Sequence, residues 1–281
     1  MSEGRADLHC HTTASDGTFS PHELVREAAK RGLSAIAVTD HDSVDSVREA
    51  MDAGRCEGVE VVPGVEISTD VDSGEVHVLG YYLDCRNEEF LQVLARQRQS
   101  RMLRVQQMIE KLSDLGVNIT FEQVLSYAGH GAVGRPHVAA ALINAGYVGS
   151  WDDAFSRYIG RHAPAYVRRS KLTPVDAVEH IRSAGGVAVL AHPGLSNQDH
   201  MIPALVEAGL GGVEAVYPDH SPTQQRHYEE IAREYSLVVT GGSDCHGPKS
   251  KSGVVLGSCT VGVDVLSRLA QSAGNGRDGA D

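Results

Sequence analysis

Apolar runs and amphipathic stretches alternate along both ends of the chain. Five apolar runs of strand length each lead into polar residues, at 34–43, 59–69, 186–194, 212–217 and 237–246. Between most of them, apolar residues recur every three or four positions, which is the period of an amphipathic helix. Strands that are apolar on both faces and alternate with helices are typical of a parallel sheet covered by helices. The pattern therefore predicts an α/β barrel.

The alternation stops in the middle of the chain. Residues 88–113 read as one long polar helix with an apolar stripe, and short helical pieces without a strand follow it. A barrel crossover does not need four consecutive helices. We therefore assign 1–99 and 169–262 to the barrel and 100–168 to a helical insertion subdomain. The remaining residues, 263–281, are expected to form a polar, disordered tail.

Two histidines lie two positions apart near the start of the chain. Along a strand, residues i and i+2 share a face, so His9 and His11 are expected to project together while Leu8 and Cys10 point the other way. The same spacing recurs near the other end, where GGSDCH places Asp244 and His246 after an apolar strand. A single histidine pair is weak evidence for a metal site, but its recurrence favours one.

Further histidines and carboxylates lie at or near the ends of the other predicted strands. The active sites of parallel barrels lie at the carboxyl ends of their strands, so these side chains should meet. Nine such groups are costly to bury together without cations between them, and one ion of four to six ligands cannot hold them all. We expect two or three ions, and the candidate ligands are His9, His11, Asp16, His41, Glu66, His77, His192, Asp244 and His246.

Composition narrows the class of protein. Asp and Glu outnumber Lys and Arg by 37 to 25, for a net charge of −12, which argues against duplex DNA binding through a basic face. The chain has no apolar run of membrane-spanning length, and its start is polar rather than signal-like. Its five cysteines lack CxxC spacing, as expected of a protein in the reducing cytoplasm.

The ordered motifs DLHCHTTASDG, AVTDHD, PGVEIS, LAHP and GSDCH, with the lone His77, resemble those of the polymerase and histidinol phosphatase (PHP) family of metal-dependent phosphoesterases. The resemblance spans about residues 5–84 and 173–258. It implies a distorted (β/α)₇ barrel of TIM-like form and three divalent ions, most often manganese, with iron or zinc as alternatives.

The resemblance also implies how the ligands divide. One ion would lie among His9, His11, Glu66 and Asp244. A second would lie between Glu66, His77 and His192, with Glu66 bridging two ions. The third would be held by Asp16, His41 and His246. Catalysis would then rest on Glu66, His192 and Asp244, with attack of a metal-bridging hydroxide on phosphorus. His192 or His220 is a candidate to protonate the leaving oxygen, although His220 otherwise reads as solvated.

Within this family, the helical insertion resembles that of phosphatases that remove the 3′-phosphate from 3′,5′-bisphosphonucleotides, whose relatives trim short oligoribonucleotides from the 5′ end. GRPH marks a helix start, so Arg135 and His137 are expected beside free backbone N–H groups, where a phosphate of the nucleotide substrate would bind. Arg168, in AYVRRSK, is a third candidate substrate contact or only a solvated rim.

Two other functions fit parts of the pattern. A histidinol-phosphate phosphatase, or another small-molecule phosphatase, would share the metal ligands but need a pocket for its own substrate, and the arginine in the insertion argues against a cationic amine. A catalytically inactive barrel kept as a binding module should have lost ligands, and none of the nine is lost.

Overall fold

The computed structural model describes residues 4–71, 74–129, 131–168, 172–248 and 253–274. The strands of its sheet are β1 (Arg5–Cys10), β2 (Ala35–Val38), β3 (Glu60–Val71), β4 (Gly74–Tyr81), β5 (Val187–Leu190), β6 (Gly212–Val216), β7 (Val238–Gly241) and β8 (Val261–Gly262). The helices are α1 (Pro21–Lys30), α2 (Val47–Glu57), α3 (Glu88–Asp114), α4 (Phe121–Ala128), α5 (Arg135–Asn144), α6 (Trp151–Ala154), α7 (Pro174–Ser183), α8 (Pro193–Ser196), α9 (Ile202–Glu207), α10 (Pro222–Glu234) and α11 (Asp264–Gly274). A π-helical turn, η1 (Phe155–Ile159), and a 3₁₀ turn, η2 (Asp199–Met201), complete the list.

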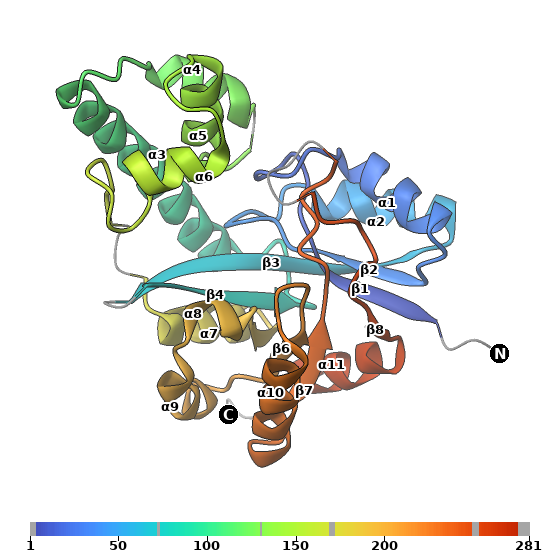
Figure 1. Ribbon diagram of the computed structural model, residues 1–281. Helices are drawn as coiled ribbons and strands as arrows, with labels where there is room; N and C mark the ends of the chain where they lie inside the picture. The colour runs from blue at the N-terminus through green and yellow to red at the C-terminus, as the bar shows by residue number, and fades with distance from the viewer. Residues whose placement is uncertain (1–3, 72–73, 130, 169–171, 249–252, 275–281) are drawn as a thin grey trace.

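The strands form one sheet in the order β7-β6-β5-β4-β3-β2-β1-β8, which curls into a nearly closed barrel (Figure 1). Closure comes from the segment after β7, where the His11 N–H donates to the Cys245 carbonyl at 2.9 Å and Cys10 bridges Cys245 in parallel. Strands β1 to β7 thus make the barrel, and β8 adds an antiparallel edge to β1. The predicted distorted barrel is confirmed.

Strand β4 runs against the predicted parallel direction. It pairs antiparallel with both β3 and β5, whereas β1–β2–β3 and β5–β6–β7 are parallel. The reason is local, because β3 and β4 are separated by only two residues, and a parallel connection needs a crossover of a dozen or more. His77 consequently lies in the middle of β4, opposite Ser68 of β3, rather than at a strand end.

Alternate residues of the strands pack into two separate cores. Outward-facing residues such as Ile36 and Val78 pack with the apolar faces of α1, α2, α7, α9 and α10. Inward-facing residues such as Leu79 and Tyr81 fill the barrel. Leu8 belongs to this inner core and Cys10 to the outer one, so, contrary to the prediction, the two do not share a face, because β1 is irregular between Asp7 and Cys10.

The predicted disordered tail is wrong over residues 264–274, which form helix α11. Its buried residues Val265, Leu266 and Leu269 pack into the inner core of the barrel. Figure 1 shows α11 next to β7. The small polar residues of its last turn made the apolar period of this helix hard to recognise in the sequence. Residues 275–281 of the predicted tail lie outside the described part of the chain.

Helix α3 connects the barrel to the insertion. Near its start, Phe90 and Leu94 belong to the outer core of the barrel. Farther along, Val105 and Leu112 belong to a third core shared with α4, α5 and α6. Figure 1 shows these helices as a lobe beside the ends of β3 and β4. The two packing environments therefore meet within one continuous helix, between Leu94 and Val105.

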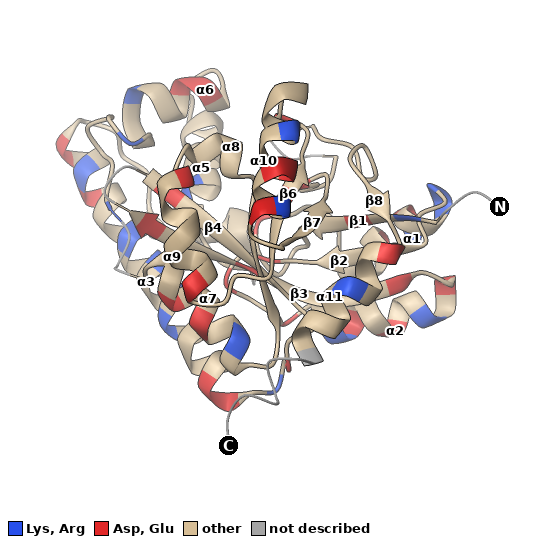
Figure 2. Cartoon of the chain, turned by 90° about the horizontal axis from the view of Figure 1, so that it is seen from below, with Lys and Arg blue, Asp and Glu red and all other residues tan. Residues whose placement is uncertain are grey.

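No described helix has the length and apolar character needed to cross a membrane. In the view of Figure 2, acidic and basic residues are interspersed over the outer helices rather than gathered by sign.

Candidate metal centre

All nine predicted ligands converge at the carboxyl end of the barrel. His9 is in β1, and His11 and Asp16 follow it. His41, His192, Asp244 and His246 follow β2, β5 and β7, whereas Glu66 and His77 lie within β3 and β4. Within the described residues, four groups of side chains have ligand atoms within 4.8 Å of one another: His11, Asp16, His41 and His246; His9, His11 and Asp244; His9, Glu66 and His192; His41, Glu66 and His77.

Glu66 is at the centre of this cluster. Its Oε1 lies 2.7 Å from His77 Nδ1 and 3.0 Å from His192 Nε2. Its Oε2 faces three more ring nitrogens, of His9 at 3.4 Å, His11 at 3.3 Å and His41 at 2.9 Å. The side chain is 1% exposed. A carboxylate between five imidazoles can bridge cations on either side of it.

Asp244 and Asp16 supply the other carboxylates of the cluster. Asp244 Oδ1 lies 3.1 Å from His11 Nε2 and 3.4 Å from His9 Nε2. Asp16 lies 3.3 Å from His246 Nε2 and 3.8 Å from His41 Nε2. Asp16 therefore joins histidines that follow β2 and β7, and Asp244, which itself follows β7, contacts the two histidines at the end of β1.

The unpaired atoms of the cluster test whether it suits cations. Seven buried side-chain nitrogen and oxygen atoms in the described residues lack a hydrogen-bond partner, and five belong to this cluster: His9 Nε2, His11 Nε2, Asp16 Oδ1, Glu66 Oε2 and Asp244 Oδ1. Such atoms are costly to bury without partners. Imidazole nitrogens and carboxylate oxygens that face one another are the donor set of divalent transition metals. The residues fit divalent cation binding.

The pKa shifts of the buried carboxylates also favour cation binding. Burial alone would raise the pKa of Glu66, but His41, His77 and His9 hold it well below its usual range. Burial likewise opposes ionisation of Asp244, yet His9 and His246 lower its pKa well below the ordinary value. The carboxylates therefore stay ionised, and the pocket favours positive charge.

The backbone is unusual where two ligands are placed. His192 and Asp244 have φ angles of 27° and 54°, a region that residues with side chains seldom adopt. Gly242 is needed nearby, because a Cβ there would lie 2.4 Å from the backbone nitrogen and the Cβ of His9. Strained or crowded backbone of this kind is concentrated at functional sites.

Sequence analysis missed two residues that contact the cluster. Glu214, in β6, is fully buried, and its carboxylate lies 3.0 Å from His9 Nδ1. The Tyr217 hydroxyl donates to Asp244 Oδ2 at 2.9 Å. A signal for Glu214 was present, because it is a lone acidic residue within the apolar run GVEAVY.

His220 is not solvated as predicted, and it is unsuited to act as the general acid. It is partly buried, its Nε2 accepts the Gly194 N–H at 3.1 Å, and its Nδ1 donates to the Ala215 carbonyl at 2.9 Å. A proton on Nε2 would oppose the Gly194 N–H.

Polar residues beside the ligands connect the cluster to the insertion. Arg101 of α3 donates to Asp42 at 2.6 Å and to Ser68 Oγ at 2.9 Å. Ser68 Oγ in turn lies 3.4 Å from His41 Nδ1. Because Arg101 and Asp42 are both buried, this ion pair fixes α3 against the mouth of the barrel.

The three predicted substrate contacts lie in different environments. Arg135 pairs with Glu75 at 2.5 Å and lies over the Phe155 ring, and Arg168 lies 3.4 Å from Asp70. His137 is buried, and its Nδ1 accepts the Gly134 N–H at 3.0 Å.

The start of α5 offers fewer backbone donors than the sequence predicted. The N–H groups of Gly134 and His137 are already bonded, to His137 Nδ1 and to the Gly134 carbonyl. Pro136 has none. Any anion bound there must therefore be held mainly by side chains.

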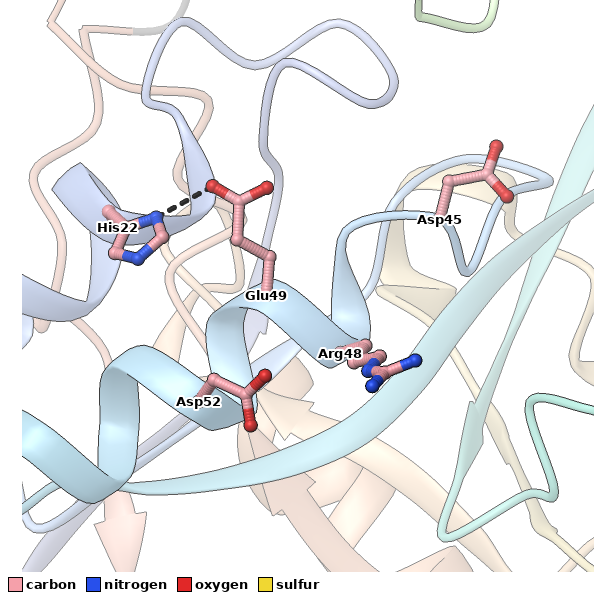
Figure 3. A pocket seen from close by; sticks show the side chains of 5 residues that line it. All are labelled: His22, Asp45, Arg48, Glu49 and Asp52. Atoms are coloured by element: carbon pink, nitrogen blue, oxygen red, sulfur yellow. Dashed lines mark hydrogen bonds and ion pairs between the residues drawn. The ribbon is translucent and has the colours of Figure 1, made fainter.

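A second group of acidic residues lines a depression on the outer surface, between α1 and α2 (Figure 3). His22 Nδ1 lies 2.6 Å from Glu49 there, but the two side chains are 57% and 50% exposed. Solvent screens such charges, and none of these residues belongs to the central cluster.

A barrel that gathers histidines and carboxylates at the carboxyl ends of its strands is typical of metal-dependent hydrolases. Comparison with known proteins makes this more specific. A family model described as the PHP domain matches residues 7–132. The chain is 33% identical over 249 residues to a 5′-3′ exoribonuclease of Escherichia coli, covering 86% of this chain and 85% of the relative. It is 31% identical over 248 residues to a 3′,5′-nucleoside bisphosphate phosphatase of Chromobacterium violaceum, covering 86% and 87%.

The solved structures agree with these relatives. A protein from Bifidobacterium adolescentis, assigned as a metal-dependent phosphoesterase, matches with a TM-score of 0.88 and 32% identity over 97% of both chains. The chain belongs to the PHP domain family, and it is a hydrolase that acts on phosphoester bonds.

Proposed function

We propose that this enzyme removes the 3′-phosphate from 3′,5′-bisphosphonucleotides and also accepts short 5′-phosphorylated oligoribonucleotides. The names of the Chromobacterium violaceum and Escherichia coli relatives support these two substrate classes. The observation that carries the proposal is the position of Arg135, which is paired with Glu75 beside the metal centre.

Glu75 and His77 are two residues apart in β4 and share a face of the strand. Two residues span about 7 Å along a strand. A phosphate that replaces Glu75 on Arg135 would therefore lie one such step from the cluster. This spacing suits a substrate with two phosphates, one on the cations and one on the arginine, which binds phosphate with two parallel hydrogen bonds.

We propose three divalent ions, most favourably manganese, with iron or zinc as alternatives. The nine donors, with Glu66 between His77, His192 and His41, support this number. When bound, the cations would supply an activated water and neutralise charge on the phosphate. Glu66, His192 and Asp244 would hold the cations, and the carboxylates of Glu66 and Asp244 keep the site negative.

The protein groups around the cations bind and orient the substrate. Arg135 holds the second phosphate. His137 accepts a backbone N–H at Nδ1, so its hydrogen is on Nε2, available to a phosphate oxygen. Burial lowers the pKa of His137, which keeps the ring neutral. Arg168 would extend the site toward a longer oligonucleotide.

The two alternative functions are not favoured. A histidinol-phosphate phosphatase would place a cationic amine near the site, and the partly exposed Arg135 beside the cluster disfavours such a cation. An inactive binding module would not keep nine converging donors.

All five cysteines are free thiols, which supports the cytoplasm as the compartment.

Phosphate release from a panel of substrates tests the proposal. Metal-stripped protein would receive manganese, iron or zinc, and then 3′,5′-bisphosphonucleotides, 3′- and 5′-mononucleotides, 5′-phosphorylated oligoribonucleotides or histidinol phosphate. We expect the highest kcat/KM for the bisphosphonucleotide, with manganese. Faster hydrolysis of histidinol phosphate, or equal rates for mono- and bisphosphates, would refute it.

A further inference from the structure

A buried glutamate outside the predicted ligand set contacts two of the ligands. Glu214 is 0% exposed and lies in β6, between β5 and β7, which His192 and Asp244 follow. Its Oε1 lies 3.0 Å from His9 Nδ1, and its Oε2 accepts the backbone N–H of His192 at 2.9 Å. Oε2 is also 3.2 Å from His9 Nδ1.

These contacts determine which nitrogen of His9 carries hydrogen. Both carboxylate oxygens of Glu214 lie at hydrogen-bond distance from His9 Nδ1, and carboxylate oxygens accept, so His9 Nδ1 donates. His9 Nε2 then keeps its lone pair, which is the form that binds a metal. This Nε2 faces Glu66 and Asp244 at 3.4 Å each and is one of the unpartnered atoms of the cluster.

The second contact acts on the backbone. His192 has a φ of 27°, and its N–H is held by Glu214. Its ring Nε2 meanwhile lies 3.0 Å from Glu66 Oε1. One carboxylate thus holds the ring of one ligand and the main chain of another.

We propose that Glu214 is a positioning residue for the metal centre, which directs the Nε2 lone pair of His9 and the ring of His192 into the cluster. Carboxylates that hold metal-binding histidines in this way support metal affinity without contacting the metal. The inference rests on the cation binding in the proposed function and not on the identity of the substrate.

The geometry explains why glutamine should not replace this residue. Both partner groups are N–H donors, and an amide has only one acceptor oxygen. In Glu214→Gln, either the His192 N–H faces the amide NH₂, or His9 does. In the second case, His9 would have to accept at Nδ1 and place its hydrogen on Nε2, which blocks the lone pair.

Metal affinity is the decisive measurement, made by competition of Mn²⁺ or Zn²⁺ with a chelator. We expect Glu214→Gln to weaken binding by ~10–100-fold, with Glu214→Asp intermediate. Glu75→Gln is the matched control, since it removes a negative charge beside the mouth but contacts neither His9 nor His192. If Glu214→Gln weakens binding no more than Glu75→Gln, the proposal is overturned.

A second measurement needs no variant, so it remains decisive if Glu214→Gln does not fold. In the zinc-loaded wild-type protein, ¹⁵N-histidine NMR should show His9 with hydrogen on Nδ1 and metal on Nε2. The opposite arrangement would overturn the proposal. If the wild-type protein binds metal as described but does not hydrolyse bisphosphonucleotides, only the substrate part of the proposed function fails.

Discussion

Glu66 faces five histidine rings at 2.7–3.4 Å, whereas Asp16 and Asp244 each face three. Glu66→Gln keeps the volume but removes the charge that would bridge two cations. We expect Glu66→Gln and Asp244→Asn to fold normally but to lose turnover by more than ~100-fold, beyond the loss typical of a residue that only supports a ligand.

Steady-state kinetics, metal analysis and circular dichroism would check this expectation. The matched control is Glu49→Gln, in the exposed depression of Figure 3, which should leave activity unchanged. If either cluster variant kept near wild-type activity with full metal content, its assignment as a ligand would be wrong.

Arg135 should act on substrate choice rather than on the chemical step. Arg135→Ala is expected to lower kcat/KM for a 3′,5′-bisphosphonucleotide by ~10–100-fold, the scale of a lost charge-assisted contact. p-Nitrophenyl phosphate offers no second phosphate, so its hydrolysis should change little. Arg157→Ala is the control, an exposed arginine of the same insertion. Equal losses on both substrates would contradict the proposed role of Arg135.

Metal binding should release protons. Burial alone would lower the pKa of His11, but the carboxylates of Asp244 and Glu66 raise it to about 10. At neutral pH the metal-free ring is therefore protonated, and a metal must displace that proton. Apparent affinity should rise as pH rises toward about 10, by roughly tenfold per pH unit for each proton released. Titration calorimetry in buffers of different ionisation enthalpy measures the number of protons released on metal binding. If no proton is released, displacement of a proton from His11 by the metal is excluded.

At the scale of elements, the β3–β4 hairpin and α11 do most to shape the barrel. The hairpin extends beyond the sheet, so His77 and Glu75 reach the cluster and the insertion from a strand that runs in the opposite direction. Helix α11 covers the inner core with Leu266 and Leu269.

Leu269→Ala tests whether α11 is part of the folded barrel. Leu269 is 0% exposed, so its truncation should lower the free energy of unfolding by about 2–5 kcal/mol. Leu103→Ala, at a position of α3 that is 53% exposed, should change it by no more than about 0.5 kcal/mol. Urea unfolding followed by circular dichroism compares the two. Equal stability of both variants would mean that α11 does not pack on the barrel.

At the scale of the whole molecule, two lobes meet over one metal centre. Arg101, Arg104 and Arg135 of the insertion pair with carboxylates of the barrel lobe, Asp42 and Glu75. Ala132 N–H also donates to the Ala14 carbonyl, next to the turn that carries Asp16. The insertion is therefore tied to the rim of the barrel, where a substrate would bind between the two.

We expect about three divalent ions per chain, because nine donors exceed the coordination of one or two ions of four ligands each. Elemental analysis of protein purified without chelator would measure the number and the identity of the metal. One ion or none would contradict a trinuclear centre.

The sequence by itself determined the barrel class, the insertion and the nine candidate ligands, because apolar period and polar strand ends are local properties of the chain. It also showed that His9 and Asp244 begin matching i, i+2 pairs. Which atoms face one another was not encoded locally. His9 and Glu214 are 205 positions apart, and their contact depends on closure of the barrel.

Only the tertiary structure decided the direction of β4, the burial of α11 and the pairing of Arg135 with Glu75. A short apolar run indicates that a strand is buried. It does not indicate which neighbouring strand pairs with it, because pairing depends on the length and path of the segments that connect the strands. Residues 264–274 form a helix although its last turn is polar, because the buried leucines of α11 pack in the inner core and packing outweighs local propensity. Glu214 was likewise visible as a lone acid in a strand, but its function follows from two N–H groups that only the folded chain brings to it.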